Sequence, residues 1–277
     1  MQTDSIHHQK AVLFRDLHAR PGCFVIPNPW DAGSARFLES LGFEALATTS
    51  AGLAFALGRP DGNAGRDETL ANARAIVDAT SLPVSADLEN GFGDSPADVA
   101  QCIRLAIEAG LAGGSIEDAT GDPERPIYDF GHAVERVAAA VEAARAAPAP
   151  FMLTARAENY LHGRPDLDDT LRRLRAFEAA GADVLYAPGL STLESVRAVC
   201  AGVGRPVNVL AGFGVPPFPV AELAEAGARR VSLGGLLSRA AFGGMLAAAR
   251  EVKEHGTFGF AANAVPMAVA NGVMRTR

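Results

Sequence analysis

The sequence predicts an α/β protein folded as a single (β/α)8 TIM barrel, and three observations support this. Eight short β-rich runs alternate with eight segments of helical spacing, a pattern typical of parallel strands covered by helices. The chain has 277 residues, close to the roughly 250 of such barrels. The first β-rich run is followed by "NPWDAGS", which is not the glycine-rich turn of a doubly wound dinucleotide-binding sheet.

The strands are expected at the runs rich in β-branched residues and leucine: 23–27, 44–50, 83–89, 112–118, 151–158, 182–188, 206–212 and 229–235. The helices are expected between them, at 31–41, 67–80, 96–109, 132–147, 168–180, 191–201, 219–226 and 237–254. Side chains that can cap helix N-termini precede three of these helices: Asp31, Ser95 and Ser191. Glycines end four of them: Gly42, Gly110, Gly181 and Gly227.

Segments outside the barrel are expected at both ends of the chain. A helix at about 4–19 precedes the first strand, and the barrel occupies about 20–254. The last segment, about 255–277, is apolar and too long to leave in solvent, so we expect it to pack on another subunit. A flexible tail is the alternative. No linker rich in Pro, Ser or Gly divides the chain, so 1–277 is predicted to form a single domain.

Composition argues against several classes of partner. The net charge of −7 offers no basic surface for nucleic acid or an anionic membrane. The chain shows no apolar signal core at its N-terminus and no run of about 18 apolar residues. Cys23, Cys102 and Cys200 are scattered without the spacing of a zinc site, which indicates reduced thiols. We therefore predict a cytoplasmic protein with neither a nucleic acid nor a membrane partner.

Polar residues gather at the carboxyl ends of three successive expected strands, where barrels place their active sites. In "PVSADLENGFGD", a period of two puts Ser85, Asp87 and Glu89 on one face, toward the barrel interior. The next strand ends at Glu117 and the one after it carries Arg156. One strand-end aspartate is often only a helix cap, whereas acids and an arginine on three neighbouring strands indicate a site.

The chemistry of this set points to a divalent cation and a carboxylate substrate. Clustered carboxylates repel one another, and Mg²⁺, or Mn²⁺ as a substitute, takes a few carboxylates while keeping several waters. Such an ion polarises a carbonyl and stabilises a developing enolate. Arg156 can hold a carboxylate bidentately, and the turn "TTSAGL" offers backbone N–H groups to a second anionic group.

Two long loops, 51–66 and 119–130, are rich in Gly, Pro and charge and suit a mobile lid. The first carries Asp61. Ordinary surface loops are the alternative. Gly234 and Gly235 lie where many barrels bind phosphate, although a helix-packing turn explains them more simply.

Five segments together resemble the isocitrate lyase/phosphoenolpyruvate mutase superfamily: "NPWDAGSARFLESLGFEALATTSAG", "SADLENGFGD", "GSIED", "TARAENY" and "PVNVLAGFG". Their order and spacing match from about residue 20 to 250. The resemblance implies a Mg²⁺-dependent barrel that cleaves or forms C–C or P–C bonds next to a carboxylate through an enolate. It also implies a homotetramer in which barrels swap C-terminal helices.

The resemblance further implies roles for individual residues. Asp87 matches the direct metal ligand, and Glu89 and Glu117 match acids that hold the metal's waters. Arg156 matches the residue that bridges substrate and site. Ser50, Ala51 and Gly52 match the turn that binds the substrate carboxylate. Asp61 matches the flap acid, and Asn208 matches a residue near the far end of the substrate. Asp61, Glu117 and Arg156 are the expected catalytic residues.

One segment departs from the family pattern. After "IED" the isocitrate and 2-methylisocitrate lyases carry K-[KR]-C-G-H and the mutases a lysine-rich segment, whereas this chain has "ATGDPERPIYDF". The leading hypothesis is a lyase that cleaves a C–C bond of a small 2-hydroxy or 2-oxo carboxylate and is weak or atypical on isocitrate. Glu124, Arg125 and Tyr128 are the candidate proton donors in place of the cysteine. The alternatives are a P–C bond enzyme acting on phosphonopyruvate, an oxaloacetate decarboxylase, and a non-catalytic barrel that binds 2-oxo acids.

Overall fold

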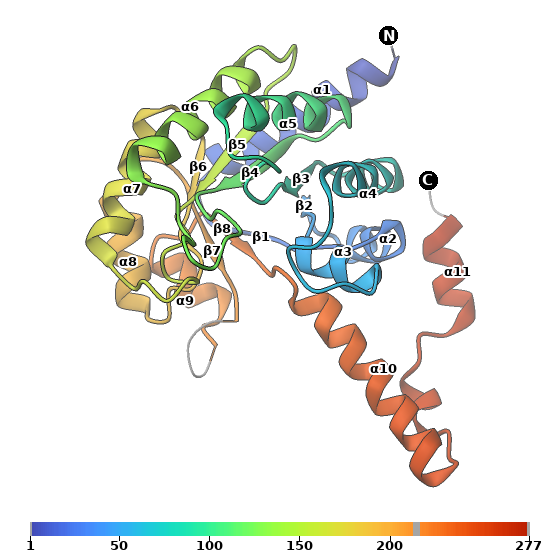
Figure 1. Ribbon diagram of the computed structural model, residues 1–277. Coiled ribbons are helices and arrows are strands. Elements are labelled where there is room, and N and C mark those ends of the chain that lie inside the picture. The colour runs from blue at the N-terminus through green and yellow to red at the C-terminus, as the bar shows by residue number, and fades with distance from the viewer. Residues whose placement is uncertain (1, 213–216, 276–277) are drawn as a thin grey trace.

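Eight parallel strands form a nearly closed barrel with helices on the outside, which confirms the predicted fold (Figure 1). The computed structural model describes residues 2–212 and 217–275; the end of the "PVNVLAGFG" motif and the last two residues of the tail lie outside the described residues. The strands are β1 Phe24–Ile26, β2 Leu46–Ala47, β3 Val84–Asp87, β4 Gly113–Glu117, β5 Met152–Arg156, β6 Val184–Tyr186, β7 Val207–Leu210 and β8 Arg230–Ser232. Each lies within a predicted run.

The strands pair in the order β1-β8-β7-β6-β5-β4-β3-β2, and the seam of the barrel lies between β1 and β2. At this seam the Ala47 N–H donates to the Pro27 carbonyl at 3.0 Å. The side chain of Asn28 spans the same seam, because its Nδ2 donates to the Thr48 carbonyl at 2.8 Å. Its Oδ1 accepts the N–H groups of Leu233 and Gly234 after β8. One amide side chain therefore joins the first, second and last strands.

The helices are α1 Gln2–Ala19, α2 Ala32–Ser40, α3 Ser50–Ala56, α4 Arg66–Ala79, α5 Pro96–Glu108, α6 Phe130–Arg145, α7 Leu167–Ala179, α8 Leu193–Gly202, α9 Val220–Glu225, α10 Leu236–His255 and α11 Met267–Arg275. Asp31 and Ser95 cap α2 and α5 as predicted. The predicted cap Ser191 is wrong, because Thr192 accepts the Ser195 N–H and caps α8. The predicted loop 51–66 begins with α3, since the Thr49 hydroxyl accepts the Gly52 N–H and starts a helix there.

The apolar faces of the outer helices pack on the outward faces of the strands and form two large core clusters. A third cluster closes the amino-terminal end of the barrel, where α1 places Phe14 and Leu17 against the starts of β1 and β5. The buried His18 of α1 also lies at this end of the barrel. Its Nδ1 donates to the Phe14 carbonyl at 2.8 Å, and its Nε2 lies 3.2 Å from Arg230 Nη1 inside the barrel. The ring must be neutral for Nε2 to accept this bond.

We expect His18 to make the protein less stable in acid. Burial, and then Arg230, lower the pKa of His18 to about 3. Between about pH 6.5 and 3 the unfolded chain binds a proton at this residue that the folded protein does not, so stability falls as pH falls. From pH 7 to pH 5 the free energy of unfolding should drop by about 2 kcal/mol more for the wild type than for His18→Gln. Urea unfolding at both pH values measures this, and equal drops would contradict it.

The C-terminal segment leaves the barrel along α10 and returns through η1 (Gly259–Asn263) to α11, which lies beside α2 of the same chain (Figure 1). Arg36 Nη1 donates to the Met274 carbonyl and ties α11 to α2. Large apolar side chains stay exposed along this excursion: Met245, Leu246, Phe258, Val265, Met267 and Val269. The predicted exchange of this segment between subunits stays a prediction. None of the helices in the described ranges is both long and apolar enough to cross a membrane.

Candidate active site

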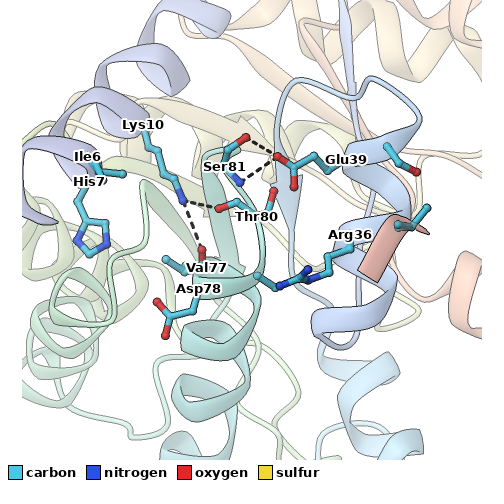
Figure 2. A pocket seen from close by; sticks show the side chains of 12 residues that line it. Ile6, His7, Lys10, Arg36, Glu39, Val77, Asp78, Thr80 and Ser81 are labelled. Atoms are coloured by element: carbon cyan, nitrogen blue, oxygen red, sulfur yellow. Dashed lines mark hydrogen bonds between the residues drawn. The ribbon is translucent and has the colours of Figure 1, made fainter. Parts of the chain in front are cut away.

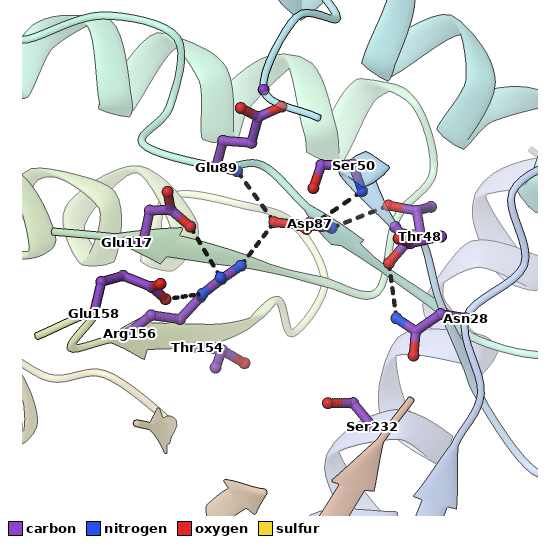
Figure 3. A network of polar contacts seen from close by, with 12 residues as sticks. Asn28, Thr48, Ser50, Asp87, Glu89, Glu117, Thr154, Arg156, Glu158 and Ser232 are labelled. Atoms are coloured by element: carbon purple, nitrogen blue, oxygen red, sulfur yellow. Dashed lines mark hydrogen bonds and ion pairs between the residues drawn. The ribbon is translucent and has the colours of Figure 1, made fainter. Parts of the chain in front are cut away.

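A cavity of about 190 Å³ opens at the carboxyl ends of the strands, where the sequence places the polar residues. Asp87, Arg156 and Asn208 line it from β3, β5 and β7, and Asp61 lines it from the segment after α3. Glu89, Glu117 and Glu158 surround Asp87 and Arg156 at the same end of the barrel (Figure 3). The structure therefore brings together the acids and the arginine that the sequence singles out.

Asp87 is held from three sides. Its Oδ1 accepts Arg156 Nη1 at 2.9 Å and the Glu89 N–H at 3.3 Å. Its Oδ2 accepts a long bond of 3.4 Å from the N–H of Ser50, and its own N–H donates to Thr48 Oγ1 at 3.0 Å. This fixes the carboxylate at the edge of the cavity, with one oxygen only weakly engaged.

Arg156 contacts three carboxylates at once. Its Nη1 lies 2.9 Å from Asp87, its Nη2 3.0 Å from Glu117 and its Nε 2.7 Å from Glu158. Because these acids outweigh the cost of burial, the pKa of the guanidinium is raised well above its usual value. Glu158 lies two residues after Arg156, at the end of the expected strand 151–158, and a period of two places both side chains on one face.

Glu89 lies next to this cluster, but its backbone is not the extended strand that was expected. The strand ends at Asp87, and Glu89 has a left-handed backbone with φ of 48°, so the predicted two-residue alternation does not reach it. Its carboxylate points away from Asp87 and Glu117 (Figure 3), and within the described residues its buried Oε1 has no hydrogen-bond partner. Burial, followed by repulsion from Asp87, raises the pKa of Glu89 to about 7. Burial also raises the pKa of Glu117 well above its usual range.

These acids fit a hydrated Mg²⁺ better than a fully protein-bound ion. Within 2–212 and 217–275, three His, Cys, Asp or Glu side chains nowhere converge closely enough to hold a metal by themselves. Mg²⁺ commonly takes one or two carboxylates and keeps several waters. The weakly engaged Oδ2 of Asp87 and the unpartnered Oε1 of Glu89 suit that arrangement. Asp87 would hold the ion directly, with Glu89 and Glu117 on its waters.

The predicted carboxylate-binding turn is the start of α3. Ser50 and Ala51 line the cavity, whereas the buried Gly52 does not. The Gly52 N–H already donates to Thr49 Oγ1 at 3.2 Å. A Cβ on Gly52 would lie 2.8 Å from Trp30 Cβ, so tight packing explains this glycine better than anion binding. Of the three predicted residues, Ser50 and Ala51 therefore line the cavity, and the Ser50 N–H donates to Asp87.

Similarity to known proteins agrees with this geometry. The model of the phosphoenolpyruvate phosphomutase family matches residues 14–253, which is most of the chain. The chain belongs to the isocitrate lyase/phosphoenolpyruvate mutase superfamily. The 2-methylisocitrate lyase of Escherichia coli strain K12 is 30% identical over 79% of this chain and 76% of that protein.

Solved structures also resemble this chain closely. A presumed lyase/mutase from Burkholderia cenocepacia J2315 superposes with a TM-score of 0.96 and 57% identity, over 98% of each chain. The 2,3-dimethylmalate lyase structure gives a TM-score of 0.85 and 29% identity, over 96% of this chain and 94% of that one. The protein is therefore an enzyme of the carbon–carbon lyase type found in this superfamily.

The segment in which this superfamily member departs from the lyases, 119–130, does not line the cavity. Glu124 and Arg125 are exposed, and Tyr128 is buried with its hydroxyl donating to Asp94 at 2.5 Å. Arg136 of α6 stacks on the Tyr128 ring and donates to the carbonyls of Asn90, Gly93 and Asp94. The three candidate proton donors do not line the cavity, whereas Leu161 of the loop after β5 does.

A second cavity, of about 540 Å³, lies between α1, α2, α4 and α11 (Figure 2). Two of its charged side chains, Lys10 and Glu39, already bond to the protein. Lys10 Nζ donates to the carbonyls of Val77 and Thr80 at the end of α4, and Glu39 accepts the backbone N–H and the hydroxyl of Ser81. These contacts join helices, and the superfamily site remains the cavity at the strand ends.

Proposed function

We propose that the protein is a Mg²⁺-dependent lyase that cleaves a C–C bond of a small 2-hydroxy or 2-oxo carboxylate through an enolate. The observation that carries this proposal is the set of carboxylates around Asp87 and Arg156 beside the cavity. Three acids are held by one arginine, while Glu89 keeps a buried oxygen that has no partner in the described part of the chain. A hydrated divalent cation would satisfy that excess of negative charge, and it would polarise the substrate's carbonyl and carboxylate oxygens.

The residues around the cavity would then have separate roles in binding the substrate and in proton transfer. Three of the five N–H groups of Arg156 bind acids, and the others would donate to the substrate. The N–H groups of Ser50 and Ala51 would bind its carboxylate. Asp61 lies at the exposed rim, where its carboxylate accepts the N–H of the neighbouring Gly62, and it would move a proton on closure of the loop. Asn208 would meet the part of the substrate deeper in the barrel.

A screen of candidate substrates tests the proposal. We expect Mg²⁺-dependent formation or loss of a 2-oxo acid with at least one of isocitrate, 2-methylisocitrate, 2,3-dimethylmalate and oxaloacetate, and loss of this activity with EDTA. Isocitrate should be a weak substrate, because no cysteine follows "IED". Release of inorganic phosphate from phosphonopyruvate would instead favour a P–C bond enzyme. Tight Mg²⁺-dependent binding of a 2-oxo acid without turnover of any compound would favour a binding barrel.

We also propose a homotetramer whose subunits exchange the C-terminal segment, and a cytoplasmic location. The apolar side chains exposed along α10 and α11 support the first proposal, because a monomer would leave them in water. Sedimentation velocity distinguishes a tetramer from a monomer.

A further inference from the structure

Two arginines lie inside the barrel, and their surroundings differ sharply. Arg156 contacts three carboxylates. Arg230 is 5% exposed and lines the inner part of the same cavity, yet it forms no ion pair with any acid of the described residues. A buried charge without a counter-charge is costly, so its presence in the interior calls for an explanation. Burial lowers the pKa of Arg230 to about 10, and it still carries its charge at neutral pH.

Neutral groups hold Arg230 across the barrel. Its Nε donates to Asn208 Oδ1 at 2.7 Å, its Nη2 to Thr154 Oγ1 at 3.1 Å and its Nη1 to His18 Nε2 at 3.2 Å. These contacts use three of the five N–H groups of the guanidinium. The bond to Asn208 also fixes its amide, because the oxygen must face Arg230 while Nδ2 donates to Ser232 Oγ at 2.9 Å. The inner end of the cavity is thus a cation held in place by three neutral hydrogen-bond acceptors.

We propose that Arg230 is a specificity-determining residue that attracts and holds an anionic group of the substrate at the inner end of the cavity; this inference rests on the proposed function. One end of the substrate is held near Asp87 and Arg156, and the opposite end then meets Arg230, Asn208 and Ser232. The acids around Arg156 already balance its charge, whereas nothing in the described residues balances that of Arg230. The cavity should therefore prefer a dicarboxylate to the matching monocarboxylate.

Two ligands of the same shape test the preference: 2-hydroxysuccinate, and 2-hydroxybutyrate, in which a methyl group replaces the distal carboxylate. Calorimetry with Mg²⁺ should show that the wild type binds 2-hydroxysuccinate at least about tenfold more tightly, the size expected for one charge-assisted hydrogen bond. In Arg230→Met the affinity for 2-hydroxysuccinate should fall about 10–100-fold, with that for 2-hydroxybutyrate within about threefold. Arg104→Met, a surface arginine bonded to Gln101, is the matched control and should change neither.

The outcomes separate the two proposals. The role proposed for Arg230 is contradicted if Arg230→Met lowers the affinity for both ligands equally or for neither. It is also contradicted if the wild type binds both ligands equally tightly. Arg230→Lys keeps the charge and should retain part of the preference, which answers the question if the methionine variant fails to fold. Asp87→Asn should weaken both ligands alike. If it changes neither, the proposed function fails, whatever Arg230 does.

Discussion

Asp87→Asn is expected to lower Mg²⁺-dependent turnover by at least about 10³-fold, with little loss of stability. The amide removes the charge of the oxygen proposed to bind the ion, and a loss of about 4 kcal/mol in transition-state stabilisation corresponds to three decades in rate. Asp87 also repels Glu89 and so raises its pKa. Arg156 keeps Glu117 and Glu158 as partners in the variant. Removing one of several clustered acids should thus leave the free energy of unfolding within about 1 kcal/mol of the wild type.

Steady-state kinetics over a range of Mg²⁺ concentrations and urea unfolding measure the two effects. Asp67→Asn is the matched control, because the side chain of Asp67 is 88% exposed on α4. A parallel loss of stability and activity in Asp87→Asn would show that this aspartate serves the fold rather than the chemistry, and full activity would exclude it as a metal ligand.

Arg156→Met is expected to abolish activity and to destabilise the fold by about 3–5 kcal/mol, because it leaves three acids without their cation. Without the guanidinium these carboxylates should ionise less readily in the folded protein. The pKa values in the folded state then rise above those of the unfolded chain, and stability falls as pH rises through the interval between them. The loss relative to the wild type should therefore be larger at pH 8 than at pH 5.

The control for this prediction is Arg74→Met, because Arg74 and Asp78 form a surface ion pair with side chains 49% and 57% exposed. Surface pairs of this kind contribute about 0–1 kcal/mol, with little dependence on pH in this range. Urea unfolding at pH 5 and pH 8 compares the variants. A cost for Arg156→Met that matches the Arg74→Met cost, or that shrinks as pH rises, would contradict the proposed charge balance.

Most of the fold could be predicted because alternating periodicity and helix caps are local signals. The alternation placed all eight strands, and Asp31 and Ser95 marked helix starts that the structure confirms. α3 was missed because "SAGLAFA" is short and follows a strand end, so its glycine suggested a loop. At its start Thr49 accepts two N–H groups, that of Gly52 at its hydroxyl and that of Leu53 at its carbonyl. Ser191 and Thr192 are adjacent capping residues, and only the backbone shows which one caps α8.

The site could be predicted as a set of residues but not as a network. Strand ends located Asp87, Glu117 and Arg156, because parallel strands bring their carboxyl ends together. Glu89 joins them through a left-handed backbone that a period of two does not describe. Arg230 was missed because it follows Arg229 at the start of a strand. The sequence does not reveal which of two adjacent arginines faces inward, and the contact of Arg230 with Asn208 depends on the register of β7 and β8.

The contacts of Asn28 have a consequence for how the protein acquires its site. Its amide joins β1 to the residues after β8, which are 205 positions away along the chain, and His18 meets Arg230 across 212 positions. Contacts between such distant segments require the closure of very long loops and tend to form late in folding. During synthesis the barrel would therefore stay incomplete, with the inner end of the cavity open, until the ribosome has released the eighth strand. Any shortened chain that ends before β8 should lack both the bonds from Asn28 to the residues after β8 and the cation inside the barrel, so the site exists only in the completed barrel.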